Sequence, residues 1–85
     1  MKYSVYILYS STKDRYYVGY SQNPKERLLE HNFGATPSTR PGIPWKIVFE
    51  EEYEDKTAAI KREHKIKKMK SRKYIENLIN INSDG

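Results

Sequence analysis

The alternation of hydrophobic and polar positions predicts three β-strands in this chain. Aromatic and β-branched residues fill Tyr3–Tyr9 and Tyr16–Tyr20, and the polar segment between them is typical of a hairpin turn. The run from Trp45 to Tyr53 also alternates, which indicates a third strand with one hydrophobic side. We expect that side to carry Trp45, Ile47, Phe49 and Tyr53.

A helix is predicted after the hairpin, and a loop after the helix. The helix begins at Asn23-Pro24, because asparagine caps well and proline fits the first helical position, and it runs to about Asn32. Leu28 and Leu29 are expected to face the core. Residues 33–44 hold two glycines and three prolines, so we expect no regular element there. The loop is either a plain surface connection or a source of phosphate-binding side chains, namely Thr36, Ser38, Thr39 and Arg40.

Two further helices complete the predicted domain. Asp55 caps a helix over about Lys56–Lys70, and Ser71 caps a last helix with an apolar face. The resulting order, strand, strand, helix, strand, helix, helix, predicts an α+β fold, a small and mainly antiparallel sheet flanked by helices. One domain spans residues 1–80, followed by a frayed tail over residues 81–85. The pairing of the third strand does not follow from the pattern.

Composition excludes several classes of function. The chain of 85 residues has no cysteine, which rules out disulfides, zinc–thiolate sites and thiol nucleophiles. The apolar N-terminal run is interrupted by serine and tyrosine and is expected to be a strand and not a signal peptide. No stretch has the length and apolarity of a membrane span. We therefore expect a cytoplasmic protein with no membrane partner.

Charge is unevenly distributed along the chain, whose net charge is +5. Residues 61–73 hold eight lysines or arginines and one acid, whereas residues 50–55 hold five acids and no base. The basic segment suits a phosphate backbone, although a solvated helix face would also explain it. The acidic run opposite a basic one would also fit a small protein-interaction domain with no nucleic acid. The candidate nucleic-acid contacts are Arg40, Lys61, Lys65, Lys67, Lys68 and Lys70.

Candidate catalytic residues lie on the hairpin and the first helix. Arg27 and His31 are four residues apart, so they share a helical face, and a fixed guanidinium beside a titratable imidazole suits work on a phosphate. Tyr6 and Tyr17 lie on the two hairpin strands, where each could pack or orient a water molecule. Separately, each of these residues has an ordinary structural explanation.

Glu63 is the only acid that points inward. On the second helix it falls between Ile60 and Ile66, and a carboxylate there is costly unless it is paired or bound to a cation. The alternatives are a metal ligand and a boundary salt bridge with Arg62, Lys67 or an arginine of another helix. A single inward carboxylate suggests at most one metal ion.

Together these residues resemble the GIY-YIG nuclease superfamily. Ser4-Val5-Tyr6 matches its first strand motif and Tyr17-Val18-Gly19 its second, with serine and valine in place of the first glycine and isoleucine. Arg27 and His31 match the helical pair, and Glu63 matches the metal-binding glutamate. The resemblance covers about residues 2–80 and is strongest to short stand-alone bacterial proteins related to the nuclease domain of the ABC excinuclease.

The resemblance implies a metal-dependent endonuclease acting on DNA, in repair or recombination, with RNA as an alternative substrate. Glu63 would hold one Mg²⁺ or Mn²⁺, and Arg27 would stabilise the transition state. Tyr6, assisted by Tyr17 or His31, would position or deprotonate the attacking water. A late asparagine of the family has Asn77 as its candidate here. The alternative is an inactive nucleic-acid-binding protein that uses the basic helix, and the oligomeric state is open.

Overall fold

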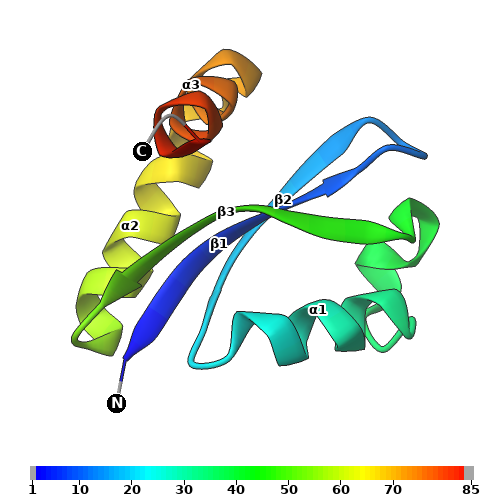
Figure 1. Cartoon of the computed structure of the whole chain (residues 1–85), viewed down its shortest axis with the longest axis horizontal. Helices are drawn as coiled ribbons and strands as arrows, with labels where there is room; N and C mark the ends of the chain where they lie inside the picture. Colours follow the sequence, from blue (N-terminus) through cyan, green and yellow to red (C-terminus); the bar gives the residue numbers. More distant parts are fainter. Residues whose placement is uncertain (1, 84–85) are drawn as a thin grey trace.

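The computed structural model describes residues 2–83 of the chain. Three strands, three α-helices and one 3₁₀-helix follow one another in the order predicted for the regular elements, with the 3₁₀-helix added (Figure 1). Their bounds are β1 Tyr3–Ser10, β2 Arg15–Ser21, α1 Pro24–Asn32, η1 Pro37–Gly42, β3 Trp45–Tyr53, α2 Lys56–Met69 and α3 Arg72–Ser83.

The three strands form one antiparallel sheet in the order β2-β1-β3, which confirms the α+β prediction. The sequence left the pairing of β3 open, and the structure places it against β1, so the first strand is central. Figure 1 shows α2 and α3 on one side of the sheet and α1 with η1 on the other. No helix in the described part of the chain is long and apolar enough to cross a membrane.

Alternation along β1 creates two separate hydrophobic clusters, one on each face of the sheet. Val5 and Ile7 pack toward α2 and α3, in the cluster that contains Ala59 and Ile66. Tyr6 and Leu8 point to the opposite face, in a smaller cluster completed by Trp45, Tyr17, Leu28, Ile43 and Ile47. A strand buried on both faces explains why residues 4–8 read as a nearly continuous apolar run. The smaller cluster carries the candidate site.

The hydrophobic side predicted for β3 is wrong, because the strand contains a β-bulge. Ile7 pairs with Phe49 while the next residue, Leu8, pairs with Ile47, so Val48 is the extra residue. The bulge reverses the alternation in mid-strand. Trp45 and Ile47 therefore pack in the smaller cluster, and Phe49 and Tyr53 pack in the larger one.

The first helix begins as predicted but buries a narrower face. The Asn23 side chain accepts a hydrogen bond from the Glu26 backbone N–H at 3.3 Å, as an N-cap should. Leu28 contacts the core, whereas Leu29 is 65% exposed, so its predicted inward position is wrong. The buried face instead follows the spacing Pro24, Leu28, His31, and Leu29 lies about 100° away from Leu28.

The segment 33–44 is more ordered than the sequence predicted. Residues 37–42 form a 3₁₀-helix, which tolerates Pro37 at its start and needs only short-range hydrogen bonds. The Thr39 N–H donates to the Thr36 carbonyl at 3.1 Å. At the other end of the chain, α3 runs to Ser83 and so includes the first residues of the expected frayed tail, whose last two residues lie outside the described part.

Candidate active site

Tyr6 and Gly19 are direct partners across the β1–β2 pair. The Tyr6 side chain lies over the glycine backbone, and a Cβ added at Gly19 would stand 2.7 Å from the Tyr6 hydroxyl oxygen. Any larger residue would therefore displace the phenol. Glycine at the end of the second strand motif is what lets Tyr6 reach across the sheet, at only 1% exposure.

Arg27 of α1 lies close to the Tyr6 hydroxyl and acts to lower the pKa of that phenol. Its guanidinium forms an ion pair with Glu30, one turn later on the same helix. The carboxylate of Glu30 raises the pKa of Arg27, which stays charged. Burial raises the pKa of the Tyr6 phenol, and the nearby Arg27 guanidinium offsets only part of that effect. Tyr6 is thus a neutral phenol close to a permanent cation.

His31 is completely buried, and its Nδ1 hydrogen-bonds to the Thr39 hydroxyl at 2.9 Å. The Thr39 hydroxyl oxygen also lies 3.1 Å from the Thr36 carbonyl oxygen. His31 Nε2 has no hydrogen-bond partner among the described residues. Burial and the nearby charge of Arg27 lower the pKa of His31. The imidazole is therefore neutral at physiological pH.

Tyr17 contacts Tyr6 and His31 and also Trp45. Its ring meets the His31 ring edge-on with centroids 4.8 Å apart, and it lies 6.5 Å from the Tyr6 ring and 6.4 Å from Trp45. Such tilted aromatic contacts fix ring orientation. The structure thus brings together four of the predicted site residues, namely Tyr6, Tyr17, Arg27 and His31.

Glu63 is buried on α2, as its place in the apolar stripe predicted, with 7% exposure. Its Oε1 lies 3.4 Å from Lys67 Nζ and 3.8 Å from His64 Nε2, and both of those side chains are more than half exposed. Arg62 is not its partner, because Arg62 pairs with Glu51 at 3.0 Å. The negative charge of Glu63 adds to the factors that raise the pKa of Tyr6, so the carboxylate lies within electrostatic reach of the phenol.

The residues present fit only a divalent ion that takes most of its ligands from water and substrate. No group of three or more His, Cys, Asp or Glu side chains converges anywhere in the described residues. A fully protein-coordinated ion is therefore not supported. Mg²⁺ keeps several waters and commonly uses one or two carboxylates together with substrate phosphate oxygens, so a single buried carboxylate such as Glu63 suffices for it.

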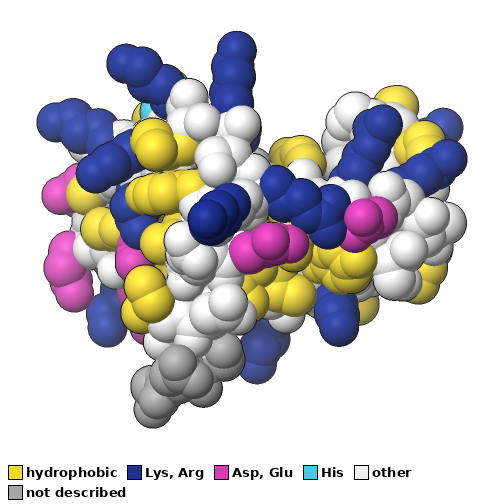
Figure 2. All heavy atoms as spheres, turned by 90° about the horizontal axis from the view of Figure 1, so that it is seen from above, with side chains coloured by type: hydrophobic (Ala, Val, Ile, Leu, Met, Phe, Trp, Pro, Cys, Tyr) yellow, Lys and Arg dark blue, Asp and Glu magenta, His cyan; other side chains and the backbone are white. Residues whose placement is uncertain are grey.

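The two arginines of the basic segment are structural, whereas its lysines are exposed and only Lys67 among them pairs with a carboxylate in the described part of the chain. Arg62 is held by Glu51 and Tyr74, and Arg72 by Asp14 and Glu76. The predicted contact residues Lys61, Lys65, Lys67, Lys68 and Lys70 are all exposed. Figure 2 shows lysine and arginine side chains projecting from several parts of one face, with acidic groups beside them.

Two other residues singled out in the sequence, the predicted contact Arg40 and the late asparagine Asn77, have different surroundings. Arg40 is exposed, and its Nε donates to the Gly34 carbonyl at 2.6 Å within the loop. Asn77 is exposed on α3, and within the described residues no hydrogen bond links it to Glu63 or Tyr6. Their predicted functional roles stay predictions.

Sequence reasoning missed two positioning residues. Thr39 was grouped with possible phosphate-binding donors, but it is 2% exposed and hydrogen-bonds to His31 Nδ1. No local pattern marks it, because its partner lies eight residues away across a turn. Glu30 could have been found, since it follows Arg27 at the helical spacing that forms ion pairs.

Comparison with known proteins identifies relatives along nearly the whole chain. A UPF0213 protein of Natronomonas pharaonis is 38% identical over 76 residues, which cover 88% of this chain and 87% of that protein. A UPF0213 protein of Staphylococcus saprophyticus is 31% identical over 77 residues, which cover 88% and 92%. The solution NMR structure of a UPF0213 protein from Bacillus halodurans superposes with a TM-score of 0.61 at 28% identity, covering 95% of this chain and 85% of that one.

A shorter match links the chain to larger proteins. A protein of Drosophila persimilis named structure-specific endonuclease subunit SLX1 homolog is 42% identical over 55 residues, which cover 54% of this chain and 19% of that protein. The GIY-YIG catalytic domain family matches residues 2–76, which contain all five predicted catalytic positions. The chain therefore belongs to the GIY-YIG catalytic domain family, within the GIY-YIG nuclease superfamily.

Proposed function

We propose that this protein is a metal-dependent endonuclease that hydrolyses phosphodiester bonds in DNA. One observation carries the proposal, namely that the buried Tyr6 phenol packs with Tyr17 and His31 close to the Arg27 guanidinium, with the carboxylate of Glu63 buried near enough to raise its pKa. A core that needed only packing would gain nothing from a guanidinium and a buried carboxylate close to a tyrosine. The name of the SLX1 relative, a structure-specific endonuclease subunit, supports the same class of reaction.

Arg27 has the position and charge to stabilise the transition state. A guanidinium next to a scissile phosphate neutralises the negative charge that develops on the phosphoryl oxygens during in-line attack. Its ion pair with Glu30 fixes the side chain before substrate arrives. Little reorganisation is then required during the reaction.

Tyr6 orients the attacking water in this proposal. Its raised pKa keeps the phenol protonated at neutral pH, so it acts through hydrogen bonds and not as a phenolate. His31 has no exposed surface and so supports the site from behind, by holding the Tyr17 ring edge-on. We therefore assign orientation of water to Tyr6 and positioning to His31, a division that the sequence left open.

Glu63 would hold the metal ion, Mg²⁺ or Mn²⁺. When bound, the ion would supply Lewis acidity at a non-bridging phosphate oxygen. Lys67 contacts the same carboxylate oxygen from the solvent side, so it competes with the ion for Oε1. The Lys67–Glu63 pair also favours a second candidate function, a binding protein in which lysine alone balances the carboxylate.

Cleavage of a substrate panel tests the proposal. Labelled single-stranded, duplex and branched DNA and the matching RNAs are incubated with Mg²⁺, with Mn²⁺ or with chelator. Tyr6→Phe, which keeps the ring and removes the hydroxyl, serves as the matched control for contaminating nuclease. We expect metal-dependent cleavage that Tyr6→Phe lowers by about 10²-fold. Equal cleavage by both proteins, or none on any substrate, would favour the binding protein. A preference for branched DNA would connect the activity to repair or recombination.

A further inference from the structure

A separate cavity opens beside the candidate site, between the β1–β2 turn and η1. Its volume is about 450 Å³, within the range of about 300–1,000 Å³ typical of small-molecule sites. Tyr17 belongs to both places, because it lines this cavity and also contacts His31 and Tyr6. The lining consists of Lys13, Arg15, Tyr16, Tyr17, Ser38, Thr39, Pro41, Gly42 and Trp45.

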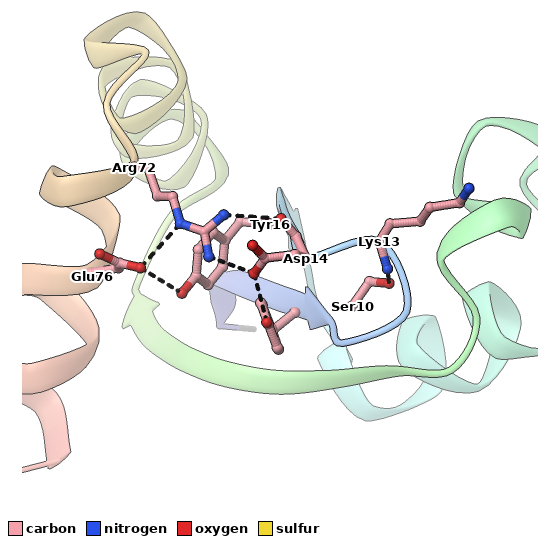
Figure 3. A network of polar contacts seen from close by, with 7 residues as sticks. Ser10, Lys13, Asp14, Tyr16, Arg72 and Glu76 are labelled. Carbon is pink, nitrogen blue, oxygen red and sulfur yellow. Dashed lines mark hydrogen bonds and ion pairs between the residues drawn. The ribbon is translucent and has the colours of Figure 1, made fainter.

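The cationic groups at this cavity are free, whereas the neighbouring acid is neutralised elsewhere. Neither the Lys13 ammonium nor the Arg15 guanidinium forms an ion pair with a carboxylate in the part of the chain that the structure describes. Asp14 lies between them in sequence, but it pairs with Arg72 of α3 and accepts a hydrogen bond from Tyr9 at 2.7 Å. Figure 3 shows this network and the Lys13 side chain pointing away from it.

The backbone conformation of the turn separates these charges. Asp14 has a positive φ of 53°, a left-handed conformation that aspartate tolerates better than most residues. Arg72 also stacks over the Tyr16 ring, 5.2 Å from its centroid, and so holds this side of the turn against α3. Asp14 is thus neutralised on the α3 side of the turn. The cavity side keeps the positive charges of Lys13 and Arg15.

The inner lining of the cavity is aromatic and closely packed. Trp45 donates its indole N–H to the Thr39 carbonyl at 2.8 Å, which fixes the ring. Gly42 lies against the indole so closely that an added Cβ would stand 2.3 Å from a ring carbon. Trp45 and Tyr17 therefore present preset aromatic surface, and the exposed hydroxyl of Ser38 lies at the rim.

We propose that this cavity binds one unpaired nucleotide of the substrate strand. The free cationic rim suits a backbone phosphate, and the aromatic wall suits the face of a base. A nucleotide carries both groups, so it fits the cavity better than a phosphate or a base alone. The inference rests on the proposed nuclease function, because sharing Tyr17 with the reaction site places the bound nucleotide beside the scissile phosphate. The substrate class is then DNA with an unpaired nucleotide next to the cleavage position.

Trp45 provides a direct readout that does not depend on cleavage, because it is the only tryptophan in the chain. Its fluorescence is titrated with a short single-stranded thymidine oligonucleotide in the absence of divalent ions. We expect a saturable change with the oligonucleotide. A blunt duplex should bind through the basic segment without changing Trp45 fluorescence. Its binding is measured separately, as a rise in the anisotropy of a label on one end of the duplex. A change of equal size with the duplex or with inorganic phosphate alone would overturn the nucleotide assignment.

Two variants probe the two parts of the cavity. Ser38→Phe fills it from an exposed position and should weaken oligonucleotide binding by about 10-fold or more. Lys13→Ala with Arg15→Ala should lower the salt slope by about 0.7 for each lost phosphate contact. Lys46→Ala with Lys56→Ala removes the same charge outside the cavity and should leave the Trp45 response unchanged. Wild-type binding by both cavity variants would contradict the proposal.

The same titration separates failure of this inference from failure of the proposed function. A Trp45 response that the cavity variants abolish, in a protein that cleaves nothing, supports the cavity and refutes the nuclease. Metal-dependent cleavage by a protein whose Trp45 fluorescence never responds to the oligonucleotide supports the nuclease and refutes the nucleotide-binding cavity.

Discussion

Tyr6 lies across the backbone of Gly19, its partner on the adjacent strand, and leaves no space there for a Cβ atom. The two motif residues therefore act as one unit, since the glycine makes room for the phenol close to Arg27. The relationship explains why a short strand motif ends in glycine although no turn requires one. It also makes the position of the phenol testable by adding a single methyl group.

Gly19→Ala should lower the free energy of unfolding by about 1–3 kcal/mol, because the new methyl group overpacks against Tyr6. Cleavage should fall with it, since the phenol is displaced. Urea unfolding and cleavage rates measure the two effects. In a Tyr6→Phe background the penalty should shrink but persist, because the ring carbon Cζ would still stand 2.9 Å from the added Cβ. An additive double mutant would refute direct contact.

Arg27→Ala should lower cleavage by about 10²-fold or more and leave the melting temperature nearly unchanged. Arg27 and its partner Glu30 are both about one-third or more exposed, so loss of their ion pair contributes little to stability. Thermal melts beside single-turnover rates measure this. Glu30→Gln is the matched control, because it removes the same ion pair and keeps the guanidinium. A variant that unfolds, or one that cleaves normally, would give Arg27 a structural role.

Glu63→Gln should abolish the rise in melting temperature that Mg²⁺ or Mn²⁺ produces, with little change in stability without metal. The stability change is small because Lys67, left without its partner, is half exposed and can be hydrated. Lys67→Ala should have the opposite effect on the metal response, because it removes the competitor for Oε1. If Glu63→Gln destabilises the fold by about 3 kcal/mol and the metal response persists, the carboxylate serves a structural ion pair.

His31 should make stability fall as pH is lowered from 7.5 to 5. Burial lowers its pKa in the folded protein, so the unfolded chain takes up a proton first, near its ordinary value of 6.5. Stability then declines below that pH until the folded protein also binds the proton, with a slope of at most about 1.4 kcal/mol per pH unit. Urea unfolding across this range measures it. His31→Gln should flatten the profile, whereas the same change at exposed His64 should not.

The lysines of α2 should make duplex binding strongly dependent on salt. Replacing Lys61, Lys65 and Lys68 by alanine should reduce the slope of log affinity against log salt by about 0.9 for each phosphate contact removed. Anisotropy titrations at several salt concentrations measure the slope. A triple alanine variant of Lys25, Lys46 and Lys56 should keep the slope, because none of them lies on the face of α2 that carries Lys61, Lys65 and Lys68. An unchanged slope in the first variant would place the nucleic acid elsewhere.

Local pattern predicted the elements of this fold but not how some of them pack. Strand alternation and caps at Asn23, Asp55 and Ser71 are short-range signals, and the structure confirms the hydrogen bond of each cap. The bulge at Val48 depends on how β3 meets β1, which no single segment encodes. The face of β3 was therefore predicted wrongly after its first half.

In the candidate site, too, local patterns revealed some residues, whereas those that depend on tertiary contacts were missed. Arg27, His31 and Glu63 could be found because helical spacing and an interrupted apolar stripe expose them in sequence. Thr39 could not, since its importance comes from a hydrogen bond that forms only when η1 folds back on α1. The cavity beside Tyr17 was equally hidden, because its walls come from the hairpin turn, η1 and the start of β3.

The bulge in β3 also bears on self-association. β3 is an outer strand, and within the described residues no further strand pairs with its free side. An open edge invites a second copy to add a strand, but a bulge twists the edge, and the exposed charges of Lys46, Glu50 and Glu52 interrupt it. The acidic run that suggested a protein partner in the sequence thus has a sufficient explanation in keeping copies of this small sheet apart.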